Sequence, residues 1–154
     1  MSNGHQEPPA RLEEDEPPHD GVTIRWLQGY RLEVAGTDSK LHVDVSAREG
    51  GDGGAFRSVE LLLGALGTCM AGTMLGFART GDIPIGQLDL RLRPVLASSP
   101  NRVERIEVQM RIGGPVSRRQ LASLQRVAQH CKIHSTLERS ARVELTIDAP
   151  AAVA

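Results

Sequence analysis

The sequence is poor in aromatic residues, with one Trp, one Tyr and two Phe among 154 residues. Because aromatic rings are the platforms on which proteins stack unpaired bases, this scarcity argues against a surface for single-stranded nucleic acid. An excess of charge is also absent, since 18 Lys and Arg stand against 19 Asp and Glu. A formal charge of -1 offers no general attraction to nucleic acid or to an anionic membrane. We therefore expect neither as a partner, and we expect an aliphatic core.

Cysteine is scarce as well, because Cys69 and Cys131 are the only two. That number is too small for the disulfide framework of a small secreted domain. Residues 1–21 also lack the basic start and the apolar run of a signal peptide. We expect a cytoplasmic protein, in which a cysteine pair is catalytic, redox-sensing, metal-binding or buried rather than a permanent bridge.

The length of the chain fits one domain with tails. Residues 1–20 contain four of the nine prolines, an acidic run "EEDE" and almost nothing apolar, which predicts a disordered tail. We place a single domain over residues 21–149 and a short C-terminal tail over residues 150–154.

Alternation of apolar and polar residues predicts several strands. The first three form an antiparallel meander, over residues 22–28, 30–35 and 40–46. A glycine-rich run over residues 48–56 then predicts a flexible loop with nothing to anchor it. Two longer strands, over residues 87–97 and 102–112, flank the turn "SSPN" as a hairpin. A last strand, "ARVELTI", is expected over residues 141–147.

A stretch without charge runs from Leu61 to Ala78, which reaches the lower length limit of a transmembrane helix. It contains four Gly and two Thr, and the strands around it need an apolar helix to cover them. We interpret it as a fully buried helix of a soluble domain, capped by Ser58 and ending at Gly81. A second, amphipathic helix is expected to begin at the N-cap Ser117.

These elements predict an α+β domain with antiparallel sheets around a buried central helix. A central helix that is apolar on every side needs cover on its second face. We therefore predict a homo-oligomer, in which Gly72 and Gly76 allow another helix to approach closely.

The two cysteines allow more than one interpretation. Cys69 shares a helical stripe with Leu66 and Thr73, so it could be a small buried packing residue. Cys131 lies in "HCKIH", between His130 and His134, which are possible zinc ligands. A zinc site needs three or four ligands, and only Cys131 and His134 would converge easily, so we do not favour a metal.

Two motifs around the cysteines resemble the OsmC/Ohr family of thiol-dependent organic hydroperoxide reductases and OsmC-like proteins. They are "SVELLLGALGTCMAG" with Cys69 and "CKIHSTL" with Cys131, within a likeness that spans residues 22–147. The resemblance implies an intertwined homodimer with sites at the subunit interface and no metal, flavin or haem. Cys69 would be the peroxidatic and Cys131 the resolving cysteine, forming a disulfide that a lipoyl-type dithiol reduces.

A peroxidatic thiol must ionise near neutral pH, and Cys69 is too far inside its own helix to profit from the N-terminal end of the helix dipole. An arginine is therefore required, and Arg31 is the first candidate before Arg25. The family's catalytic glutamate precedes the first cysteine by ten residues, where this chain has Val59. Glu60 stands next to it, and could cap its helix or reach an arginine across the dimer.

We predict a peroxidase that reduces apolar organic hydroperoxides in oxidative stress defence. The alternative is a non-catalytic relative that binds a small apolar ligand or a thiol partner at the dimer interface. Val59 favours the alternative, as does Lys132, which stands where the peroxidases usually carry proline.

Overall fold

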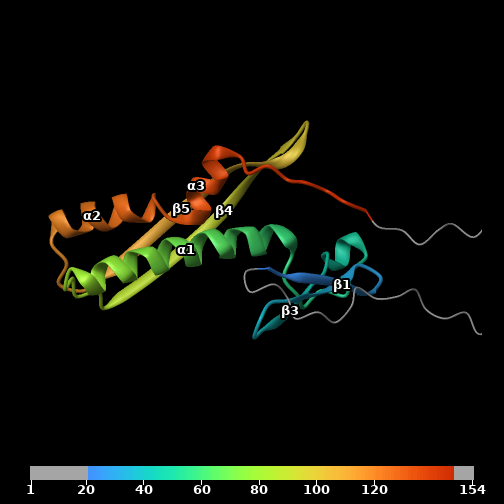
Figure 1. Ribbon diagram of the computed structural model, residues 1–154, viewed down its shortest axis with the longest axis horizontal. Coiled ribbons are helices and arrows are strands. Elements are labelled where there is room, and N and C mark those ends of the chain that lie inside the picture. The colour runs from blue at the N-terminus through green and yellow to red at the C-terminus, as the bar shows by residue number, and fades with distance from the viewer. Residues whose placement is uncertain (1–20, 148–154) are drawn as a thin grey trace, which may run out of the picture. The chain divides into compact units, whose positions relative to one another are not determined.

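The structure, a computed structural model, describes residues 21–147, so the tails expected over residues 1–20 and 150–154 lie outside the described residues. The chain divides into two compact units (Figure 1). The second unit is Phe56–Ala141, and the first takes the described residues before and after it. The elements, in chain order, are β1 (Thr23–Gln28), β2 (Arg31–Ala35), β3 (Lys40–Val43), a 3-10 helix (Ala47–Glu49), α1 (Ser58–Thr80), β4 (Gln87–Ser98), β5 (Asn101–Gly113), α2 (Arg118–Ala128) and α3 (Lys132–Arg139).

The first unit contains the predicted meander. Its three strands pair antiparallel in the order β1-β2-β3, with Leu32 of β2 opposite both Trp26 of β1 and Val43 of β3. The glycine-rich run after β3 is anchored, contrary to expectation. The buried carboxylate of Asp44 accepts hydrogen bonds from the backbone N–H groups of Val45 (2.8 Å) and Asp52 (3.0 Å). A buried carboxylate needs such donors, and the loop supplies one of them.

The long helix α1 occupies the centre of the second unit. It spans the predicted range and ends at Gly81, whose N–H donates to the carbonyl of Phe77. Its N-cap is Arg57 rather than the predicted Ser58. The reason is that the carboxylate of Glu60 accepts a hydrogen bond from the backbone N–H of Arg57 (3.0 Å), which places the helix start one residue earlier.

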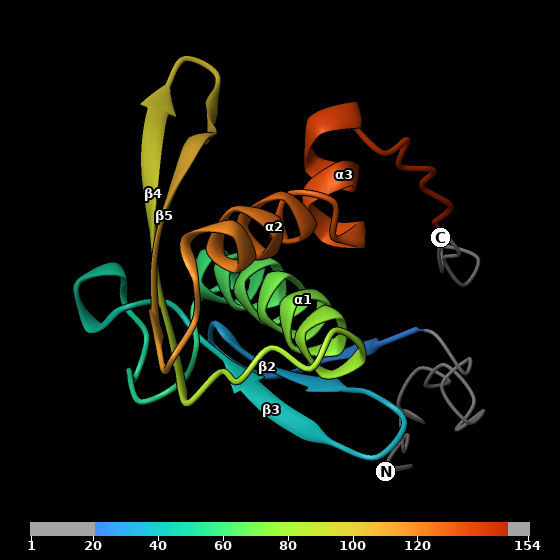
Figure 2. The same ribbon diagram turned by 90° about the vertical axis from the view of Figure 1, so that its left-hand side faces the viewer.

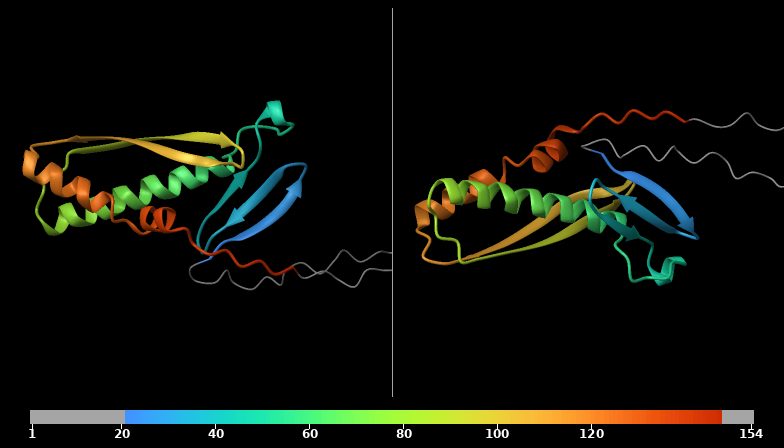
Figure 3. Two further views of the ribbon diagram at one scale, coloured as in Figure 1. Left: turned by 90° about the horizontal axis from the view of Figure 1, so that it is seen from above. Right: turned by 60° about the horizontal axis from the view of Figure 1, so that its bottom comes forward.

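The β4–β5 hairpin matches its prediction, and the three helices lie on one face of it (Figures 2 and 3). At Gly67 of α1, a Cβ atom would lie 2.8 Å from Cδ1 of Leu92, so the glycine allows β4 to approach the helix closely. The predicted helix α2 begins after its N-cap Ser117, whose Oγ accepts from the N–H of Gln120 (3.3 Å).

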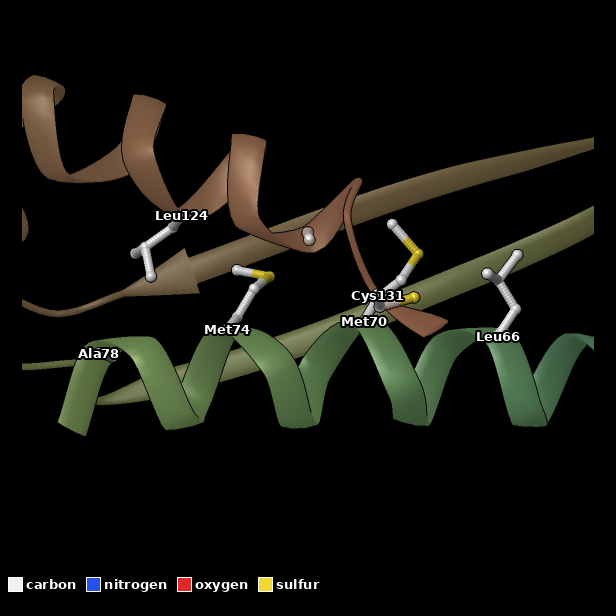
Figure 4. Packing of buried hydrophobic residues seen from close by; sticks show 7 residues of the cluster. Leu66, Met70, Met74, Ala78, Leu124 and Cys131 are labelled. Atoms are coloured by element: carbon white, nitrogen blue, oxygen red, sulfur yellow. The ribbon is translucent and has the colours of Figure 1, made fainter. Parts of the chain in front are cut away.

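The core of this unit follows one stripe of α1. Residues four apart on that helix meet residues of α2 and Cys131 in a single cluster (Figure 4). Its buried members are Leu66, Met70, Met74, Ala78, Leu124, Ala128 and Cys131.

Only one face of α1 is buried within the chain, and its second face is the one for which the sequence predicts a covering partner. Leu75 is 47% exposed, and Cβ atoms built on Gly72 and Gly76 would meet nothing within 4 Å. Among residues 21–147, α1 is the one helix with the length and composition of a membrane span, and 28% of its most apolar window is buried.

The C-terminal part of the described chain differs from the prediction in two ways. The helix α3 was not expected, because the motif around Cys131 was interpreted as the end of the preceding helix. Residues 141–147 form no strand, although they alternate as strands do. Their apolar residues Val143, Leu145 and Ile147 are 88%, 81% and 77% exposed. A strand needs a hydrogen-bonding neighbour, which an alternating pattern alone cannot supply.

Candidate active site

The structure brings the two cysteines together. Cys69 lies at the middle of α1, partly buried beside the core stripe, and both thiols are free. Cys131 is 1% exposed, and its sulfur lies against α1 near Met70 (Figure 4). The side chains of Cys69 and Cys131 lie close enough for each to shift the pKa of the other. Their proximity is the geometric precondition for a thiol pair that can exchange a disulfide.

The first turn of α3 stabilises the Cys69 thiolate. The backbone N–H of Ile133 is the largest cause that lowers the pKa of the Cys69 thiol. The thiol of Cys131, the N–H of Lys132 and the positive charge of Lys132 lower the pKa further, while partial burial opposes them. These N–H groups are available because the first N–H groups of a helix have no partner inside it.

This arrangement adds a second source of stabilisation to the predicted arginine, whose role stays a prediction. The helix that carries Cys69 cannot stabilise the thiolate with its own N-terminus, but a second helix directs its N-terminus at the sulfur. In the structure Cys131 is the N-cap of this helix, and its sulfur accepts a hydrogen bond from the N–H of His134 (3.4 Å).

The pKa of Cys131 is shifted in the opposite direction. Burial of Cys131 is the main cause that raises the pKa of its thiol, and the neighbouring Cys69 raises it further. The N–H groups of His134 and Ile133 act against this shift. The pair is therefore asymmetric, with Cys69 the more acidic thiol and Cys131 the less acidic one. Such a pair can carry out nucleophilic attack at Cys69 followed by condensation with Cys131.

Glu60 lies in the first turn of α1, in the same unit as the cysteines. Its Oε1 accepts from Nη2 of Arg57 at 2.6 Å, and its Oε2 accepts from the backbone N–H of Arg57. The backbone hydrogen bond is the largest cause that lowers the pKa of Glu60. These contacts make Glu60 the capping residue of α1, and its catalytic role stays a prediction.

The candidate arginines belong to the first unit. Arg31 begins β2, where its Nη2 donates to Nδ1 of His42 (3.3 Å). Arg25, on β1, lies 3.9 Å from the carboxylate of Glu33. That Arg31 or Arg25 contacts Cys69 stays a prediction.

The histidines beside Cys131 have partners other than a metal. Nδ1 of His130 lies 2.7 Å from the carbonyl oxygen of Arg126, and Nε2 of His134 lies 3.2 Å from Oε1 of Glu138. Within the described part of the chain, no three His, Cys, Asp or Glu side chains are grouped to hold a metal ion.

Comparisons with known proteins place the two motifs in a wider context. The family model described as OsmC-like protein matches residues 51–146. The chain is similar to an OsmC-like protein from Mycoplasma pneumoniae, with a TM-score of 0.69 and 18% identity over 77% of this chain and 86% of that one. For an OsmC-like protein of unknown function from Vibrio cholerae, the TM-score is 0.66 and the identity 14%, over 77% and 92% of the two chains.

A third similar structure, from Legionella pneumophila, is described as an organic hydroperoxide resistance protein and predicted redox protein. Its TM-score is 0.58 and its identity 17%, over 75% of this chain and 88% of that one. No curated protein matches the sequence. These identities show a shared fold, and the family resemblance predicted from the cysteine motifs is confirmed.

Proposed function

The chain belongs to the OsmC-like protein family, and from this premise we propose that it is a cysteine-based peroxidase that reduces organic hydroperoxides in oxidative stress defence. One observation carries the proposal: Cys131 and the first turn of α3 lie beside Cys69, and the Ile133 N–H and the Cys131 thiol lower the pKa of Cys69. A cysteine that only packs in an apolar core would have a raised pKa, because burial in apolar surroundings disfavours the thiolate. The lowered pKa of Cys69 therefore distinguishes it from a packing residue.

The proposed cycle has three steps. The Cys69 thiolate attacks the terminal oxygen of the hydroperoxide, so that the O–O bond breaks and an S–O bond forms. The alkoxide takes up a proton and leaves as an alcohol, and Cys69 is left as a sulfenic acid. Cys131 then attacks the sulfenic sulfur, which releases water and forms the Cys69–Cys131 disulfide. A lipoyl-type dithiol reduces this disulfide and becomes oxidised itself.

The unequal pKa shifts support this division of roles. The nucleophile that meets the peroxide must be ionised before oxidation, whereas the resolving thiol acts only afterwards. Cys69, with the lowered pKa, fits the first role, and the buried Cys131 fits the second. The apolar surroundings of the pair favour a hydroperoxide with an apolar body over hydrogen peroxide.

We also propose that the protein acts as a homodimer. The exposed face of α1 around Gly72 and Leu75 is free to pack against a second copy. Within the segment 141–147, exposed apolar residues alternate as in a strand. The backbone of this segment would gain hydrogen-bonding partners on a sheet edge of that copy. In such a dimer Arg31 could come to Cys69 from either subunit, in addition to the stabilisation by α3.

Of the two residues that favour a non-catalytic relative, Val59 and Lys132, the structure supplies an argument against the second. Lys132 differs from the proline usual in the peroxidases, but its N–H and its charge lower the pKa of Cys69. The substitution therefore keeps the thiolate stabilised by other means. Val59 still distinguishes this chain, and we expect it to affect the rate rather than the type of reaction.

Steady-state turnover tests the proposal. The reduced protein is given cumene hydroperoxide with dihydrolipoamide, and consumption of the peroxide is compared with that of hydrogen peroxide. We expect turnover by the wild type, a preference for cumene hydroperoxide, and none by Cys69→Ser. If Cys69→Ser consumes the peroxide as fast as the wild type, or neither protein does, the proposal is wrong.

A further inference from the structure

Charge is distributed unevenly along the chain. Residues 1–20 carry six acidic side chains and one basic side chain, a formal charge of -5, although the whole chain carries only -1. Residues 108–137 carry five basic side chains and no acidic one, a formal charge of +5. Two segments of opposite charge in one protein attract each other. The five basic residues are Arg111, Arg118, Arg119, Arg126 and Lys132.

Three of these cations lie on one face of α2. At about 100° per residue, Arg118, Arg119 and Arg126 fall within an arc of about 100° around the helix axis. Leu124, which is fully buried in the core, lies on the opposite side of the helix. The three arginines are exposed, and α2 contains no acidic residue. This surface, the arginine face of α2, therefore carries charge of one sign only.

The arginine face lacks a counter-charge within the described part of the chain. At other positions of the second unit an arginine pairs with a nearby glutamate, as Arg102 does with Glu104 at 2.9 Å. Among residues 21–147, no carboxylate forms an ion pair with Arg118, Arg119 or Arg126.

The position of two of these charges opposes the helix that carries them. Arg118 and Arg119 stand in the first turn of α2, where the helix dipole is positive and a cation is unfavourable. The stability of α2 itself thus gives no reason for a cation at either position. An anionic segment bound to the arginine face would compensate both charges.

We propose that the acidic run "EEDE" at residues 13–16 binds the arginine face of α2. The run offers four consecutive carboxylates, and a guanidinium group can hold a carboxylate through two parallel hydrogen bonds. Because the run is tethered to the protein, its local concentration at the face far exceeds that of a separate partner. The bound run also shields the face from nucleic acid and other polyanions. This interaction does not depend on the peroxidase reaction.

Carbodiimide coupling on the full-length protein tests the contact, because it joins a carboxylate to a neighbouring lysine amine and leaves arginine unreacted. The chain has two lysines, Lys40 and Lys132, so an additional lysine can be followed by peptide mass mapping. Arg119→Lys and Arg126→Lys each place one amine on the arginine face and keep its charge.

The matched controls are Arg91→Lys and Arg93→Lys in β4. Both positions are exposed arginines without an ion pair among the described residues. Their neighbours Leu90 and Leu92 pack against the core, so alternation along the strand places both arginines on the side of the hairpin that faces away from the helices.

We expect residues 13–16 to couple to Arg119→Lys and Arg126→Lys with a yield at least about fivefold above that of the two controls, as a tethered contact would give. The difference should vanish in about 1 M NaCl, where the Debye length falls to about 3 Å. Equal yields at all four positions, or a difference that persists in this salt, would overturn the proposal.

A variant of the tail provides an independent measurement. Its four carboxylates are neutralised together, as Glu13→Gln, Glu14→Gln, Asp15→Asn and Glu16→Gln. Two-dimensional NMR should show shifted amide signals in α2 and unchanged signals in β4, which also demonstrates that the variant is folded. The variant should bind labelled single-stranded DNA at about 0.15 M salt more tightly than the wild type does, because its face is open. Unchanged α2 signals, or equal DNA binding by both proteins, would show that the tail does not cover the face.

Discussion

Cys131 lies beside Cys69, whose pKa it lowers, and is at the same time the N-cap residue of α3. One side chain therefore holds the start of the helix whose N–H groups stabilise the neighbouring thiolate. The proposed resolving cysteine and the N–H groups that lower the pKa of Cys69 thus belong to the start of one helix. Several consequences of this coupling can be measured.

The reactivity of Cys69 should titrate below the ordinary cysteine pKa of about 8.5. The folded-state pKa of Cys69 is lowered, so the thiolate persists as the pH falls until that lower pKa is reached. Alkylation by iodoacetamide, followed by peptide mass mapping from pH 5 to 9, gives the inflection at each cysteine. Cys69 should show the lower value and Cys131 the higher. Equal inflections would contradict the asymmetry of the pair.

Ile133→Pro should slow alkylation of Cys69 near pH 6.5, because proline lacks the N–H that contributes most to the lowered pKa. The position is in the first turn of α3, where a missing N–H breaks no bond within the helix. Each unit by which the pKa rises should reduce the rate about tenfold. Ile133→Ala removes the side-chain packing and keeps the N–H, so it should retain the wild-type inflection. A matching loss in Ile133→Ala would assign the effect to packing.

Cys131→Ala should destabilise the reduced protein more than Cys131→Ser does. Sγ of Cys131 accepts from the N–H of His134, and a serine hydroxyl can replace it as an N-cap, whereas alanine cannot. The difference between the two variants should be about 1 kcal/mol in the free energy of unfolding. Urea denaturation with a thiol reductant present measures it. Equal stabilities would show that the cap contributes nothing.

Leu145→Glu should weaken the proposed dimer. Leu145 is 81% exposed in a segment that alternates as a strand, and a charge there would oppose its burial against a second copy. Light scattering after size-exclusion chromatography should show a dimer for the wild type and mostly monomer for the variant. Thr146→Glu, on the opposite side of the extended chain, is the matched control and should stay dimeric. A dimeric Leu145→Glu would place the interface elsewhere.

Much of the fold could be predicted because its signals are local. The alternation over β4 and β5 and the glycine after α1 act within a few residues, and the structure confirms the elements that they indicated. Ser58 was misplaced as a cap because the decisive contact is made by the Glu60 side chain, which reaches back to Arg57. The strand expected over residues 141–147 failed for a different reason, since its pairing partner cannot be read from its own residues.

The candidate site was only partly predictable. The motifs identified Cys69 and Cys131, but the spacing of two distant residues does not determine whether their side chains meet. The stabilising group was missed because Ile133 acts through its backbone N–H, which every residue except proline possesses. Only the position of α3 gives that N–H its role. His134 was considered as a zinc ligand, whereas its unpaired Nδ1 is visible only in the structure.

The most direct test of the central claim is a single-turnover oxidation. Reduced protein is mixed with one equivalent of cumene hydroperoxide, and intact mass and peptide mapping are followed in the wild type, Cys69→Ser and Cys131→Ser. We predict a Cys69–Cys131 disulfide in the wild type, a trapped Cys69 sulfenic acid in Cys131→Ser, and no oxidation in Cys69→Ser. If both thiols of the wild type survive minutes of exposure, the two cysteines are not a peroxidatic pair.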